Sequence, residues 1–150
     1  MANLVTVAQS DSANDGGSGT TLYPPQVSNA NDDAILIKVT QSLNNASQVA
    51  AITVTVPTGY TQIRDIRDSE VRSWVFYKRS TGNETIPTVT SSASSKWTCA
   101  TAVVTDVDWA NGGVNQNVAN TGGGDQKSPD LTTHSAGGAS AIVCFYSLER

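Results

Sequence analysis

The side chains that most often carry acid–base or nucleophilic chemistry are few in this chain. His134 is the single histidine, in a loop that leads into a predicted strand. A serine hydrolase needs a histidine base, a carboxylate that orients it and a serine held on a sharp turn. No such nucleophile motif occurs, so the sequence predicts no catalytic residue and no enzyme. A hydrolase would require His134 to lie near an Asp or a Ser.

Asp106 and Asp108 would place two carboxylates on the same face of a strand, because alternate residues of a strand point to the same face. Such a pair can serve a glycosidase or bind Ca²⁺, but a turn at the end of a strand is the simpler explanation. The oxygen-rich segment 11–17 lacks the terminal Glu of an EF-hand loop. We therefore expect no metal site and no cofactor.

Cys99 and Cys144 are the only cysteines, and both lie in apolar runs. The favoured interpretation is two buried thiols that act as small hydrophobic side chains. A disulfide is the alternative, and it would require the two Cα atoms to lie within about 7 Å of each other. A zinc site is disfavoured because there is no Cys-x-x-Cys pair.

The overall charge excludes further classes. A net charge of −4 is opposite to what binding a phosphate backbone requires, so nucleic acid is not an expected partner. The sequence contains no run of about 18 apolar residues, so no membrane span is predicted. The first residues have neither a basic nor an apolar signal region, so we expect no secretory export.

The composition predicts the elements that would position these residues. The 150 residues include 18 Thr, 17 Ser and 16 Val, a mixture that favours strands because β-branched side chains fit a pleated sheet. We expect an all-β protein, an antiparallel β-sandwich with a jelly-roll-like form, and no helix. The strands are predicted at residues 34–41, 50–56, 60–67, 73–79, 85–90, 97–107 and 139–146, the run 97–107 being a central strand.

Residues 1–33 are expected to precede the sandwich, which would occupy residues 34–150. A short strand is predicted at residues 3–9, and residues 10–33 form an irregular arm rich in Gly, Pro, Asn, Asp and Ser. Such an arm is either disordered or bound to a partner. Exposed apolar groups in a polar segment favour contact with another surface, so the candidate contacts are Leu22, Tyr23 and Val27.

Residues 61–79 hold eight charged side chains. The simpler interpretation is a solvated edge hairpin, whose charges prevent aggregation. The alternative is a contact surface toward a neighbouring subunit, with Arg64, Arg67 and Arg72 pairing with acidic groups.

Four segments, in this order, resemble a β-sandwich family of phage structural proteins and some bacterial surface proteins. They are Asp33-Ala-Ile-Leu-Ile-Lys, Val56-Pro-Thr-Gly-Tyr-Thr, Trp74-Val-Phe-Tyr-Lys-Arg and Ala100-Thr-Ala-Val-Val-Thr-Asp-Val-Asp. The resemblance covers about residues 32–146, with Tyr60 where the family usually has Trp and Thr105-Asp106 in place of its usual ending. The family pattern continues past residues 139–146, so we expect either completion by another copy or partner, or a longer polypeptide.

The resemblance implies a virion protein on the capsid surface, a decoration (cement) protein or head-fibre base that binds and stabilises neighbouring capsid subunits. Its partners would be the major capsid protein or other virion subunits, and a homo-oligomer such as a trimer is expected. The alternative function is a tail-fibre or adhesin module that binds a host-surface glycan. The three Trp and four Tyr could form its sugar platform, or could pack in the core.

Overall fold

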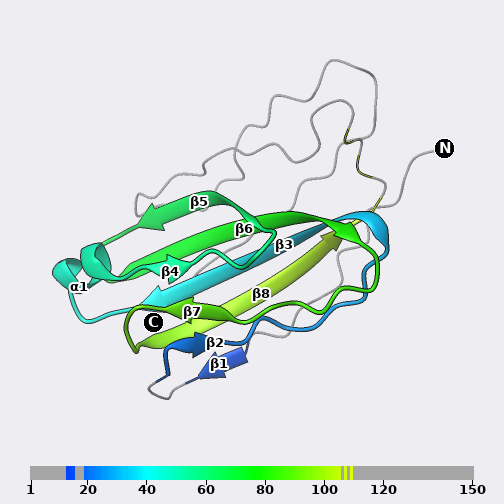
Figure 1. The fold of residues 1–150 in the computed structure, drawn as a ribbon. Helices are drawn as coiled ribbons and strands as arrows, with labels where there is room; N and C mark the ends of the chain where they lie inside the picture. Colours follow the sequence, from blue (N-terminus) through cyan, green and yellow to red (C-terminus); the bar gives the residue numbers. More distant parts are fainter. Residues whose placement is uncertain (1–12, 16–18, 106, 108, 110–150) are drawn as a thin grey trace, which may run out of the picture.

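The computed structural model describes residues 13–15, 19–105, 107 and 109, which form two packed antiparallel sheets (Figure 1). The five-stranded sheet has the order β1-β8-β3-β6-β5, and the three-stranded sheet has the order β2-β7-β4. The elements are β1 (Ala13–Asp15), β2 (Thr21–Leu22), β3 (Asn31–Ser42), α1 (Ala46–Ala51), β4 (Val54–Thr55), β5 (Thr61–Arg67), β6 (Val71–Thr81), β7 (Val89–Ser91) and β8 (Lys96–Val104). The predicted all-β sandwich is confirmed, and the jelly-roll form stays a prediction.

β3 is the centre of the larger sheet. It pairs with β6 on one side and with β8 on the other, and every residue from Asp33 to Gln41 is buried. An apolar run with this burial on both faces is what a central strand requires, because both of its faces are covered. The strand predicted at residues 34–41 is thus confirmed, and the central position belongs to β3, whereas residues 97–107 correspond to its neighbour β8.

The main core lies between the two sheets. Alternate residues of β3 (Ile35, Ile37 and Val39) point into it, because side chains alternate between the faces of a strand. We call this side of the five-stranded sheet the inner face. The other buried members of the core are Leu22, Ile52, Tyr60, Trp74, Phe76, Ile86, Val89, Trp97, Cys99 and Val103.

The opposite side, which we call the outer face, carries a smaller cluster of Ala34, Leu36 and Ala102. Its partly buried neighbours are Tyr77, Val104, Val107 and Trp109. Lys38 also belongs to this face and is only 8% exposed, and burial lowers the pKa of its ammonium group to about 8. Both faces of the sheet are therefore buried along β3.

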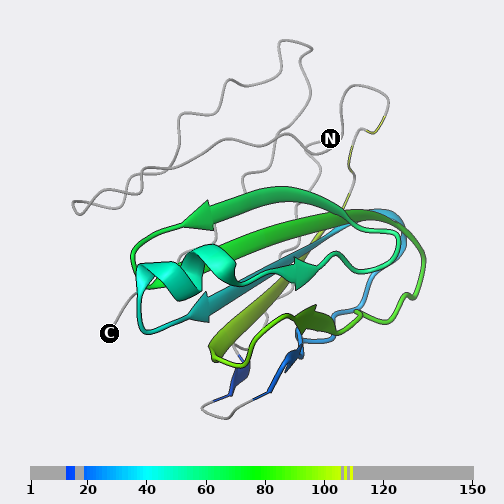
Figure 2. The same cartoon turned by 60° about the vertical axis from the view of Figure 1, so that its left-hand side comes forward.

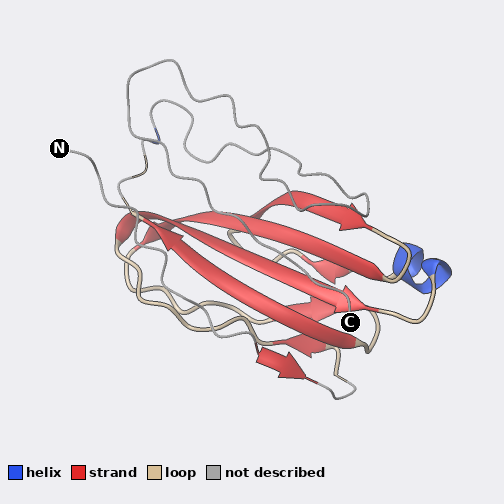
Figure 3. Cartoon of the chain, turned by 180° about the vertical axis from the view of Figure 1, so that it is seen from behind, coloured by secondary structure: helices blue, strands red, loops and turns tan. Residues whose placement is uncertain are grey.

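The strand predicted at residues 50–56 is mostly wrong, and so is the expectation of no helix, because a short helix ends at Ala51 and strand begins only at Val54. The Asn45 side chain caps the helix by accepting from Gln48 N at 3.0 Å, and Gln48 Oε1 accepts from Asn44 N. Three Ala residues favour the helix, and Val49 provides its buried contact. Only Val54–Thr55 remain as strand, and α1 lies at one end of the sandwich (Figure 2, Figure 3). The strand predicted at residues 85–90 is likewise short, with β7 beginning only at Val89.

The described part of the predicted arm belongs to the sandwich. β1 pairs with β8, and β2 pairs with β7 through Thr21 and Leu22. A boundary at residue 33 therefore does not separate an arm from the sandwich in this part of the chain. The strands predicted at residues 3–9 and 139–146 lie outside the described residues.

Candidate interaction edge

The three apolar residues of the arm have different environments. Leu22 is fully buried in the main core, so the expectation that it contacts a partner is wrong. Val27 is partly buried and packs against the same core. Tyr23 is 57% exposed and lies 6.3 Å from the ring of Trp97. Only Tyr23 therefore has the exposure that we expected of all three.

Two amide side chains that the sequence analysis did not single out fasten the arm to its own sandwich. Gln26 Nε2 donates to Ile86 O at 2.8 Å, and Ile86 N donates to Gln26 Oε1 at 2.9 Å. Asn29 Nδ2 donates to Glu84 O, and its Oδ1 accepts from Glu84 N and Ser80 Oγ. Each amide thus bonds to the backbone as a neighbouring strand would.

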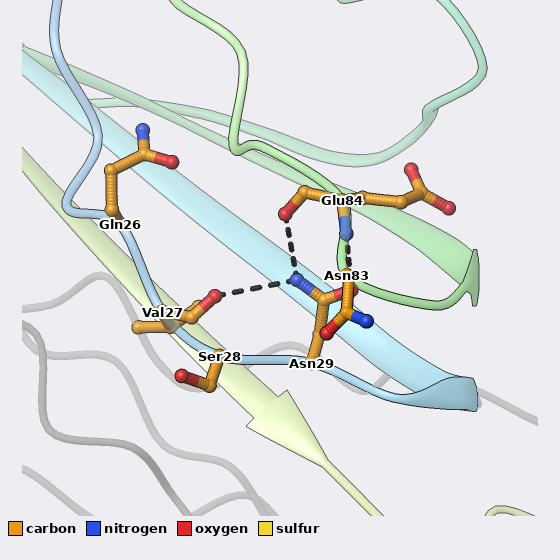
Figure 4. Close-up of a pocket in the computed structure, with 6 residues that line it drawn as sticks. All are labelled: Gln26, Val27, Ser28, Asn29, Asn83 and Glu84. Atoms are coloured by element: carbon orange, nitrogen blue, oxygen red, sulfur yellow. Dashed lines mark hydrogen bonds between the residues drawn. The ribbon is translucent and has the colours of Figure 1, made fainter.

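A shallow hollow of about 300 Å³ lies beside these bonds (Figure 4). It is lined by Gln26, Val27, Ser28, Asn29, Asn83 and Glu84. Gly82 and Asn83 turn the chain here with φ angles of 97° and 48°. Because the hydrogen-bonding groups of Gln26 and Asn29 are directed at the protein backbone, the hollow is a joint in the fold and offers few groups to a ligand.

Some charged side chains of segment 61–79 are paired within the fold, and others are not. Arg72 is 8% exposed and binds Asp65 through two contacts, Nε to Oδ1 at 2.8 Å and Nη2 to Oδ2 at 2.7 Å. Its Nη1 donates to the carbonyl oxygens of Val49, Ala50 and Ile52 at the end of α1. The expectation that Arg72 is available to a partner is therefore wrong, because it joins β5, β6 and α1.

The pKa values in this joint follow from the pairing. Hydrogen bonds from Arg72 are the largest cause that lowers the pKa of Asp65, and burial opposes them. The same hydrogen bonds raise the pKa of Arg72. Both groups are therefore charged at neutral pH, as a bidentate Arg–carboxylate pair requires.

Two more cations of this segment are paired inside the chain. Lys78 binds Glu84 and lies over the ring of Tyr60, which it approaches to 5.9 Å. Arg79 binds Asp32 at 2.7 Å and lies over the ring of Trp109 at 5.4 Å. The Trp109 ring stacks on Tyr77 at 6.5 Å and donates through Nε1 to Asp32 O, so it covers the end of the outer-face cluster.

Arg64 and Arg67 of β5 differ from these cations. Neither forms an ion pair or a side-chain hydrogen bond among the residues that the structure describes, and the Nε of Arg64 is a buried donor without a partner there. Among the described strands, β5 is the last of its sheet and pairs with β6 alone (Figure 1). We call this open strand, with its two arginines, the β5 edge.

The residues considered for catalysis or metal binding give no assembled site. Asp106, Asp108, His134 and Cys144 lie outside the described residues. Cys99 is a free thiol in the core, and burial raises its pKa to about 12. Within the described ranges, no three His, Cys, Asp or Glu side chains gather as metal ligands would.

None of the described helical segments has the length and apolar character that crossing a membrane requires. Comparison of the chain with protein-family models, with curated proteins and with solved structures finds no match.

Proposed function

We propose that this chain is a structural protein of a bacteriophage particle, a decoration protein or head-fibre base that binds neighbouring subunits on the capsid surface. The observation that carries the proposal is the β5 edge, where the last described strand of the sheet presents two arginines that form no ion pair in the described part of the chain. Exposed strand edges are the places where other chains add to a sheet. The resemblance of residues 32–146 to phage sandwich proteins supports the same function.

The division of charges also supports a contact role. Arg72, Lys78 and Arg79 are paired with carboxylates of the chain itself. Arg67 is exposed, and Arg64 is partly exposed. Charged groups at a contact fix register and partner choice more than they raise affinity. The β5 edge therefore has the character of a specific contact with an acidic surface.

Whether the chain lies on the capsid can be tested on phage particles from the organism that encodes it, purified on a density gradient. Peptide mass spectrometry should find the chain in intact particles, and antibody labelling should place it on the capsid. Absence from the particles would contradict the proposal, and labelling confined to the tail would favour the glycan-binding alternative.

The test of the edge uses the double variant Arg64→Glu/Arg67→Glu, added to particles that have been stripped of the native protein. We expect about tenfold weaker binding, measured by co-sedimentation. Lys96→Glu, which reverses an exposed cation of β8, is the control and should bind as the native chain does. Equal binding by all three proteins would remove the β5 edge from the contact.

A further inference from the structure

The four strands that end the two described sheets are very unequal in length. β2 and β4 have two residues each and β1 has three, whereas β5 has seven. Natural proteins limit unwanted pairing by keeping edge strands short. Among the described strands, β5 is therefore the edge with room for a further strand.

The sequence of this edge has an unusual charge order. Residues 64–68 read Arg-Asp-Ile-Arg-Asp, so reversing the direction of the chain exchanges every Arg with an Asp about the central Ile66. Arg64, Ile66 and Asp68 lie on one side of the strand, and Asp65 and Arg67 lie on the other. Asp68 directly follows β5, where its N–H donates to Val71 O at 2.8 Å.

Geometry limits how a second copy of β5 can pair with the first. Two identical antiparallel strands are related by a two-fold axis perpendicular to the sheet. Because opposite residues must share a face, one residue of the strand has to lie opposite its own copy, and the axis passes between the two. Centring the pair on Arg64, Asp65 or Arg67 places two like charges opposite each other, which destabilises a sheet. Centring it on Ile66 places Arg64 opposite the partner's Asp68 and Asp65 opposite the partner's Arg67.

The neighbours of Arg67 favour this register. On β6 the residue directly opposite Arg67 is Arg72, another cation. Arg72 turns away to bind Asp65, whereas Arg67 forms no ion pair among the described residues. The Asp65 side chain keeps 31% of its surface exposed, and a carboxylate has lone pairs for further donors. Arg67 lies close enough to Asp65 of its own chain to lower the pKa of that carboxyl, but the two form no ion pair. A second Asp65 would thus give Arg67 a direct acidic partner.

We infer that two copies of this chain pair antiparallel through their β5 edges about Ile66, joining the five-stranded sheets of two molecules into one continuous sheet. The bulge between Gln62 and Arg64 limits the pairing to the second half of β5, because a bulge bends a strand away from its neighbour. The assembly is a two-fold dimer, in place of the trimer that the resemblance suggested.

This inference rests on the proposed function, because both assign a contact to the β5 edge. It identifies the subunit that binds this edge as a second copy of the chain. The dimer forms from purified protein, so the two ideas can fail separately. A monomeric chain that still binds particles through Arg64 and Arg67 would overturn the dimer alone. A dimer that is absent from particles would overturn the virion role alone.

The test is a charge exchange that restores pairing only in the inferred register. Arg64→Asp places two carboxylates opposite each other at both ends of the dimer, and we expect about tenfold weaker dimerisation in sedimentation equilibrium. Adding Asp68→Arg to this variant should restore the native dissociation constant. Adding Glu70→Arg instead gives the same net charge at an exposed position outside the pair, and should not restore it.

A crosslink gives an independent measurement, in a chain whose Cys144 is replaced by Ser. Oxidation should join two copies of the Ile66→Cys variant through a disulfide, because cross-strand Cβ atoms lie about 4.5–5.5 Å apart. Gln62→Cys is the control and should not crosslink, since its two copies would lie about eight residues apart along the strand, on the order of 27 Å. Circular dichroism confirms that each variant is folded.

A native chain that stays monomeric up to about 0.1 mM would overturn the inference. So would a trimer, rescue by Glu70→Arg as complete as by Asp68→Arg, or crosslinking by Gln62→Cys alone. A dimer that is weakened by Arg64→Asp, rescued only by Asp68→Arg and crosslinked at Ile66→Cys would establish the register.

Discussion

At the scale of single residues, Arg72 illustrates why a buried cation requires a complete set of partners. It binds the Asp65 carboxylate and three carbonyl oxygens at the end of α1, and its guanidinium lies 5.2 Å from the ring of Trp74. A buried charge that loses its partner is costly, even where the intact pair adds little net stability. The hydrogen bonds of Arg72 therefore hold β5, β6 and α1 in one arrangement.

Asp65→Asn should lower the free energy of unfolding by about 1–3 kcal/mol at neutral pH, because Arg72 loses its charged acceptor. Pairing lowers the pKa of Asp65 below its ordinary value near 3.8. The stabilisation is therefore complete above that value and is lost as the pH falls through the lowered pKa. Urea denaturation of the native and variant chains should show a stability difference at pH 7 that shrinks below about pH 4.

Glu70→Gln is the control for this variant, since it removes an exposed carboxylate of the same hairpin. A stability difference for Asp65→Asn that is no larger than that of Glu70→Gln would show that the pair does not stabilise the fold.

At the scale of elements, the apolar pattern was sufficient to predict the long strands. Residues 34–41, 60–67 and 73–79 were predicted as strands and lie within or closely around β3, β5 and β6. The helix is not predicted because residues 46–56 combine an Ala-rich beginning with a period-two pattern, so that both helix and strand are possible. The capping by Asn45 and Gln48 favours the helix.

The environments of the candidate contacts could not be predicted in the same way. From the sequence alone, Leu22 is an apolar residue in a polar segment, and Arg72 is one of several charged residues in its segment. Leu22 pairs opposite Val89, which is distant in the sequence. Arg72 binds Asp65 within its own hairpin, but its burial also depends on the distant Val49, whose carbonyl oxygen it reaches. Burial by residues this distant depends on the topology, which the local pattern does not contain.

Gln26→Ala should loosen the arm, because it removes both hydrogen bonds to the Ile86 backbone. We expect a loss of about 1–2 kcal/mol in stability, and faster hydrogen exchange of the Ile86 amide than in the native chain. The Val89 amide in β7 should stay protected until the whole sandwich opens.

Ser28→Ala is the matched control, since Ser28 lines the same hollow and is exposed. If the Ile86 amide exchanges equally fast in the native, Ser28→Ala and Gln26→Ala chains, the amide of Gln26 does not fasten the arm.

At the scale of the whole molecule, Cys99 reports on the opening of the main core. It is 2% exposed between the sheets, and burial raises the pKa of its thiol to about 12. Because the thiolate is the reactive form, alkylation requires the core to open. In a chain with Cys144→Ser, Cys99 should react with iodoacetamide only as fast as the molecule unfolds, measured by mass spectrometry across a urea series.

Thr98→Cys in the same background is the control, since Thr98 is exposed on the neighbouring position of β8. That chain should take up one label at once and the second at the unfolding rate. Rapid uptake of a label at Cys99 in the absence of urea would mean that the core opens locally, without unfolding of the sandwich.

The central position of β3 has a consequence for synthesis on the ribosome. Its second neighbour, β8, is complete only about sixty residues after β3 itself. At about 5–20 residues per second, roughly 3–12 s pass during which one edge of this buried central strand has no partner. Nascent chains at this stage are open to aggregation, and a chaperone that shields extended apolar segments would raise the yield most if it acts before Val104 emerges.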